Sequence, residues 1–144
     1  MLNFSTSTDT GRIFDAISRS QAVIQFDPTG HILTANENFC QAVGYGLKEI
    51  VGQHHRMFCD PAYAASADYR DFWLRLAKGE YDSNSYKRYG KGGKEIWIQA
   101  AYNPIRDLNG KVCKVVKFAT DVSERMSAIN SLGAGLKALS DGLH

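Results

Sequence analysis

Alternating apolar and polar positions predict the strands of this chain. They flank three turns, at Pro28-Thr29-Gly30, at the glycine-rich residues 90–93 and at residues 107–110. The run 112–118 is β-branched and apolar, as is typical of a buried strand. The five predicted strands are, in order, residues 21–27, 31–34, 81–89, 94–102 and 112–118.

Apolar residues at helical spacing predict the helices. Asp9 is expected to cap a first helix that ends near Ser20, after a frayed start, and Gly44 suits the end of a helix over 36–43. A short helix over 47–51 and a longer one from Pro61 to Gly79 follow. The longer helix has an apolar face that consists of Tyr69, Phe72, Trp73 and Leu76.

The C-terminal segment, residues 123–144, has the spacing of a helix that pairs with another helix. Its apolar residues recur in steps of three and four, with a single doublet of threes, which is close to a heptad seam. Its glycines weaken the isolated helix by about 1 kcal/mol each. We therefore expect it to be ordered by an identical chain. The seam consists of Val122, Met126, Ile129, Leu132, Leu136, Leu139 and Leu143.

Two strands, then helices, then three strands predict an α+β domain with an antiparallel sheet. The connecting helices cover one face of that sheet. The other face is expected to be covered by the flanking helices or by a partner. The pattern stops within the last helix, so we expect the chain to be a piece of a longer protein.

Composition places the chain among ordinary globular proteins. Hydrophobic residues make up 44%, charged residues 22%, and the net charge is +2 without basic blocks. This balance does not indicate nucleic acid as a partner. No apolar run approaches the ~20 residues that span a bilayer, and no signal-peptide core is present, so we expect a cytoplasmic location.

Few residues are candidates for catalysis or for binding a metal ion or a phosphate. No catalytic elbow, zinc motif or paired acids in an apolar setting occur, which argues against an enzyme. The glycines at 90–93 precede a strand rather than a helix, which favours a hairpin turn over a phosphate loop. The three cysteines form no metal or disulfide pattern and are interpreted as reduced thiols.

His54 and His55 leave two interpretations open. One is a hydrogen-bonded core histidine beside a surface histidine. The other is a contact to haem or to a small ligand, with His54 or His55 as the metal-bound residue. Trp73 and Trp97 either fill the core or line a cavity within it.

Several segments together resemble a PAS domain over residues 20–125. Residues 22–36 are similar to the first PAS hairpin, and residues 39–53 to the short helices after it. The junction Asp121-Val122-Ser123-Glu124-Arg125 is similar to the motif that ends the last PAS strand. Residues 54–58 and 114–121 further resemble the N-terminal PAS modules of bacterial methyl-accepting chemotaxis proteins.

The resemblance implies a PAS fold with helices on one face of its sheet. It divides the chain into an N-terminal cap helix (1–20), a sensory domain (21–122) and a C-terminal connector helix (123–144). It implies a homodimer that relays a ligand or redox signal to its connector. The chemotaxis kinase and its coupling protein would bind to a signalling domain outside this chain.

The resemblance also suggests cofactors and site residues. Haem b and, less favoured, FAD are the alternatives. The helical histidine of haem-binding PAS domains would fall near Ala67, and the flavin-binding Trp and Asn near Tyr81 and near Lys87 or Arg88. The candidate ligand residues are His55, Met57, Trp73, Tyr86 and Trp97. The candidate relay and dimer residues are Asp121, Arg125, Ile129, Leu132 and Leu136.

Overall fold

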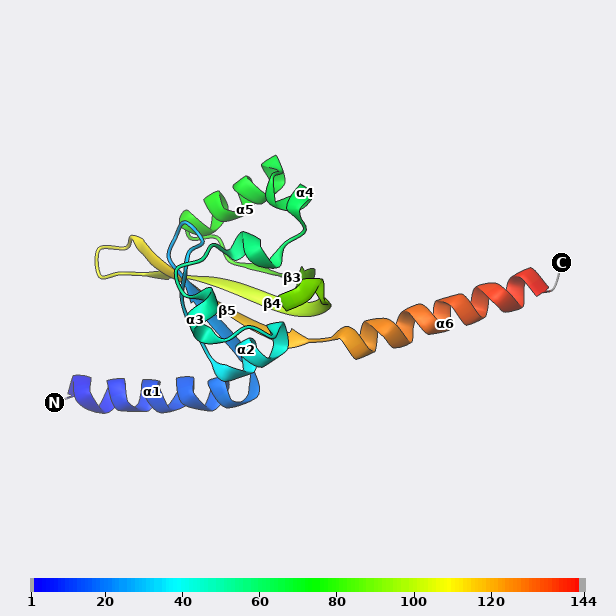
Figure 1. The fold of residues 1–144 in the computed structure, drawn as a ribbon. Helices are drawn as coiled ribbons and strands as arrows, with labels where there is room; N and C mark the ends of the chain where they lie inside the picture. The colour runs from blue at the N-terminus through cyan, green and yellow to red at the C-terminus, as the bar shows by residue number, and fades with distance from the viewer. Residues whose placement is uncertain (1, 143–144) are drawn as a thin grey trace.

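The computed structural model describes residues 2–142 and contains a five-stranded antiparallel sheet with strand order β2-β1-β5-β4-β3 (Figure 1). The α+β class and the five strands are therefore confirmed. The long C-terminal hairpin forms the centre of the sheet, and the N-terminal hairpin extends it beyond β5. The strands are β1 (Ala22–Phe26), β2 (Ile32–Ala35), β3 (Asp82–Tyr89), β4 (Glu95–Arg106) and β5 (Val112–Asp121).

The helices between β2 and β3 cover one face of the sheet (Figure 1). Asn36 caps α2 by accepting a hydrogen bond from the Phe39 amide, and Gly44 ends it with a left-handed φ of 75°. Both ends of this helix were predicted. The elements are α2 (Glu37–Val43), α3 (Leu47–Ile50), the 3-10 turn η1 (His55–Phe58), α4 (Pro61–Ala64) and α5 (Ala67–Ala77).

The prediction of one helix from Pro61 to Gly79 was wrong. The Ser66 hydroxyl accepts a hydrogen bond from the Tyr69 amide and so starts a new helix, α5, after the single turn of α4. The predicted apolar face survives this break. Tyr69, Phe72, Trp73 and Leu76 are all buried against the sheet.

Strand β4 continues beyond its predicted end at Tyr102 and includes Pro104. The ladder between β3 and β4 begins with the pair Asp82 and Tyr102, so β4 has no β3 neighbour after that point. A proline, which lacks an amide hydrogen, is tolerated at such an open edge.

Two helices flank the domain and extend away from it in opposite directions (Figure 1). Helix α1 (Leu2–Ser20) ends where predicted but starts at Leu2, so the expectation of a frayed start before Asp9 was wrong. Helix α6 is Ser123–Gly142. Within residues 2–142 no helix combines the length and the apolar character that a membrane span needs.

The candidate seam of α6 is exposed in the single chain, at Ile129, Leu132, Leu136 and Leu139. Exposed apolar residues along one face are expected of a helix that pairs with another helix. The pairing itself stays a prediction. Leu143 lies outside the described residues.

Candidate functional site

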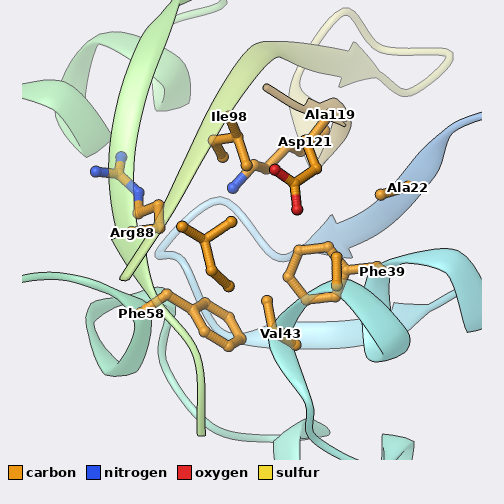
Figure 2. A pocket seen from close by; sticks show the side chains of 11 residues that line it. Ala22, Phe39, Val43, Phe58, Arg88, Ile98, Ala119 and Asp121 are labelled. Carbon is orange, nitrogen blue, oxygen red and sulfur yellow. The ribbon is translucent and has the colours of Figure 1, made fainter. Parts of the chain in front are cut away.

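A small cavity lies between α2, η1 and the inner face of the sheet (Figure 2). Its walls are apolar on the helical side, where Phe39, Val43 and Phe58 converge, and Ile98 and Ala119 face them from the sheet. About 20 Å³ is open to the centres of water molecules, which is room for about one of them. The cavity can therefore hold a small group without rearrangement.

Two cationic side chains line this cavity. Lys117 of β5 is only 1% exposed and Arg88 of β3 only 5%. The Lys117 ammonium lies 4.8 Å from the ring centre of Tyr102 and 5.8 Å from that of Phe39. Sequence reasoning missed Lys117 as part of the interior and named Arg88 only as one of two positions near a flavin-binding asparagine.

A polar network crosses the core beside the cavity, with the fully buried His55 at its centre. Its Nδ1 lies 2.8 Å from the Tyr69 hydroxyl and its Nε2 2.9 Å from the Tyr102 hydroxyl. Burial, reinforced by the charges of Lys117 and Arg88, holds the pKa of His55 well below its usual value. Burial raises the pKa of Tyr102 to about 12. Both groups are therefore neutral at neutral pH.

The structure places three of the predicted ligand residues around His55. The Trp73 ring centre lies 5.4 Å from that of His55, Tyr86 packs edge-on against Tyr102 at 5.8 Å, and Met57 packs on the same core. His54 is half-buried at the rim of this cluster, where its ring centre lies 6.0 Å from that of Trp73 and 6.2 Å from that of Tyr69. The division into one interior and one outer histidine agrees with the core interpretation.

The expectation that Trp97 lines the interior cavity was wrong. Its neighbours Ile96 and Ile98 are buried on the inner face, so the alternation of β4 points Trp97 to the opposite face. There it lies in a groove with Ser123 and Met126 of α6. The alternation of the sequence already contained this signal.

Asp121 joins the cavity to α6. It lines the edge of the cavity (Figure 2). Its Oδ1 accepts a hydrogen bond of 2.8 Å from the Ser123 amide at the start of the helix. The Ser123 hydroxyl in turn accepts from the Trp97 amide at 3.0 Å, and the Val122 amide donates to the Trp97 carbonyl. Arg125, two residues after Ser123 on α6, is exposed.

A haem or a flavin would have to fit among these interior side chains. A haem iron needs a free imidazole nitrogen, but both nitrogens of His55 are hydrogen-bonded. The ring nitrogens of His54 are also hydrogen-bonded, Nε2 to the Thr29 carbonyl and Nδ1 to the Arg56 amide. Aromatic side chains fill the space that a flavin ring would need, apart from the small cavity. In this arrangement the residues fit neither group. Residues 2–142 also contain no cluster of three or more metal-binding side chains.

Comparison with known proteins gives matches over most of the chain. The family model described as "PAS fold" matches residues 32–119. The biofilm dispersion protein BdlA of Pseudomonas aeruginosa is 48% identical over 112 residues, which are 78% of this chain and 27% of BdlA. The aerotaxis receptor of Escherichia coli is 33% identical over 114 residues, 78% of this chain and 22% of the receptor. The chain thus spans about a quarter of these relatives.

Solved structures show the same fold. A light-oxygen-voltage domain studied with a flavin analogue superposes with a TM-score of 0.67 at 22% identity, covering 88% of this chain and 96% of that one. An RNA-binding light-oxygen-voltage receptor gives a TM-score of 0.71, also at 22% identity. The match covers 96% of this chain and 40% of the receptor chain. With the family match over residues 32–119, this architecture assigns the chain to the PAS-fold family.

Proposed function

We propose that this chain is the sensory and dimerisation module of a chemotaxis receptor. Residues 21–122 would sense a signal in the interior, and the helix over 123–144 would carry it to a signalling domain. The observation that supports this most directly is the double role of Asp121, which lines the cavity and also accepts a hydrogen bond from the first amide of α6. The similarity to the aerotaxis receptor supports the receptor class.

The proposed relay uses the junction between β4, β5 and α6. A change in the cavity that moves Asp121 alters its hydrogen bond to the first amide of α6, and the bonds of Ser123 and Val122 to Trp97 extend the change to the neighbouring strand. A coupling of ~1–3 kcal/mol is enough to reset a helix pair. The module itself would be non-enzymatic and cytoplasmic. The chemotaxis kinase and coupling protein would bind elsewhere in the longer protein.

A hybrid receptor tests this function. The chain replaces the matching segment of the E. coli aerotaxis receptor, and the tumbling bias of swimming cells is measured. The hybrid is expected to control the bias, and Asp121→Ala to fix it in one state. Asp71→Ala, on the exposed surface of α5, is the matched control and should leave the bias unchanged. If the tumbling bias is the same in the wild-type hybrid and in both variants, the proposal is contradicted.

A flavin-based redox sensor is the second candidate, because a structure in the same fold concerns flavin in a light-oxygen-voltage domain. The filled interior argues against it. The absorbance spectrum of freshly purified protein separates the two. A flavin or haem band that follows the protein through gel filtration would favour the redox sensor.

A further inference from the structure

A groove separate from the interior cavity lies along the exposed flank of α5. It is bounded by the β1–β2 turn, the start of η1, the connection between α4 and α5, and α5 itself, and its volume is about 550 Å³. Helices α4 and α5 lie at the top of Figure 1 and α1 at the bottom, while α6 leaves the domain on a third side. Pairing of two chains through α1 or α6 therefore leaves this groove open.

The floor of the groove is apolar and shallow enough for another helix. Arg70, Leu74 and Ala77 follow one another in steps of four and three, so they lie on one face of α5. The Leu74 side chain is 58% exposed and stands out from this face. Across the groove lie Ala64 and Ala65, whose small side chains allow a second backbone to approach closely.

The rim of the groove is basic. Arg56 and Arg70 are exposed and, within residues 2–142, neither makes an ion pair, whereas Arg75 on the same helix is paired with Asp71. No described lining residue carries a carboxylate. Asp27, beside the β1–β2 turn, accepts hydrogen bonds from two amides of that turn. The two guanidinium groups are therefore free to bind an anionic partner.

The groove is already formed in the single chain. His54 Nδ1 accepts a hydrogen bond of 3.0 Å from the Arg56 amide, and its Nε2 donates to the Thr29 carbonyl at 2.8 Å, which fixes the β1–β2 turn against η1. A side chain at Gly30 would come within 2.7 Å of His54 Nε2 and 2.9 Å of Trp73 Cε2, so the turn packs closely on both rings. A partner would not have to order these walls, which lowers the cost of binding.

We propose that this surface, the α5 groove, docks an acidic amphipathic helix of a partner protein. The partner helix lies along α5, with apolar side chains at positions i, i+3 or i+4, and i+7 against Leu74 and the alanines. The 11 residues of α5 extend over about 16 Å, which is room for about three turns. Its carboxylates pair with Arg56 and Arg70, whose planar guanidinium groups suit them. The site lies outside the interior and does not depend on the proposed sensory function.

Charge also separates a foreign partner from a second copy of this chain. The two exposed helices of the chain are balanced in charge: α1 contains Asp9 and Asp15 with Arg12 and Arg19, and α6 contains Glu124 and Asp141 with Arg125 and Lys137. Neither helix has the excess of carboxylates that two unpaired arginines favour. Complementarity of charge therefore favours an acidic segment of another protein.

Selection from a displayed library of helical peptides tests the groove. Peptides of about 14 residues, varied along one face, are presented to the 144-residue chain, and those that also bind the Leu74→Glu variant are removed. Leu74→Glu is expected to fold, because the side chain is exposed. The remaining peptides are expected to be acidic, with apolar residues at the spacing given above. An empty selection, or peptides without an excess of acidic residues, would overturn the proposal.

Binding of one selected peptide to charge variants locates the contact. In fluorescence anisotropy Arg70→Glu is expected to weaken binding about tenfold, and replacement of the facing glutamates of the peptide by lysine to restore it. Arg75→Glu, on the same helix but outside the groove, is the matched control and should keep wild-type affinity. Equal losses in the two variants would indicate a general effect of charge and contradict the site.

Sedimentation velocity of the Leu74→Glu variant distinguishes the two kinds of occupant. A foreign partner predicts that this variant has the same oligomeric state as the wild type. Dissociation of a wild-type dimer by Leu74→Glu would assign the α5 groove to self-association and contradict the proposal.

Discussion

His55 is an interior polar residue that the fold keeps neutral. Two tyrosine hydroxyls occupy its ring nitrogens, and the charges of Lys117 and Arg88 oppose its protonation. Its folded pKa therefore lies well below the value of 6.5 expected in the unfolded chain. Between these two values the unfolded state binds more protons, so the free energy of unfolding rises with pH.

This difference predicts an acid-sensitive stability. The contribution of His55 is complete above pH 6.5 and is lost as the pH falls below it, with a slope that approaches about 1.4 kcal/mol per pH unit. Urea unfolding from pH 7 to pH 5 measures it. His55→Phe should flatten this part of the profile, whereas His31→Phe, at an exposed position, should not. An equal slope in both variants would show that other groups carry the effect.

Trp73 is the largest apolar side chain on the inner face of α5, where it contacts Phe26 and Phe72 edge-on at 5.3 and 5.6 Å. Trp73→Ala should lower the free energy of unfolding by roughly 3–5 kcal/mol, because the lost ring leaves a cavity. Trp97→Ala, on the outer face, should cost clearly less. A Trp73→Ala variant that melts like the wild type would contradict this packing.

Some of these buried residues could be predicted from the sequence and others could not. The face of Tyr69, Phe72, Trp73 and Leu76 could be predicted, because apolar spacing decides which side of a helix is buried. Lys117 could not, because a lysine is expected at the surface unless its neighbours show otherwise. Val115 and Ala119 on the same face of β5 do show it, but only once the strand phase is known.

Local chemistry also explains which elements could be predicted. Asn36 and Gly44 set both ends of α2 without help from the rest of the fold. The break between α4 and α5 could not be predicted, because serine occurs within helices as well as at their caps. Ser66 alone therefore does not indicate a helix start. The far end of β4 could not be predicted, because it depends on where the pairing with β3 stops, and that is set by the tertiary structure.

The seam of α6 predicts a dimer. Leu132→Asp with Leu136→Asp places like charges opposite each other across two paired helices, so dimer should give way to monomer in sedimentation velocity, with the core still folded. Leu108→Asp, at an exposed hairpin turn, is the control and should stay dimeric. A dimer that survives the double substitution would move the interface to α1, where Ile13, Phe14 and Ile17 are exposed.

At the scale of the whole molecule, one junction connects the interior to the helix that leaves it. The cavity, Asp121 and the first turn of α6 are contiguous, and the bonds of Trp97 tie that turn to the central hairpin. The family and the order of its elements could be read from motifs along the chain. The ligand and the partner could not, because they are molecules outside it.

The central claim is that the cavity and α6 are coupled through Asp121. Amide hydrogen exchange of α6 measures this in four proteins: wild type, Val43→Ala, Asp121→Ala and the double variant. Val43→Ala enlarges the cavity from its helical wall, and we predict that it changes exchange in the first turns of α6 only where Asp121 is present. A change of equal size with and without Asp121, or no change in α6 at all, would contradict the account.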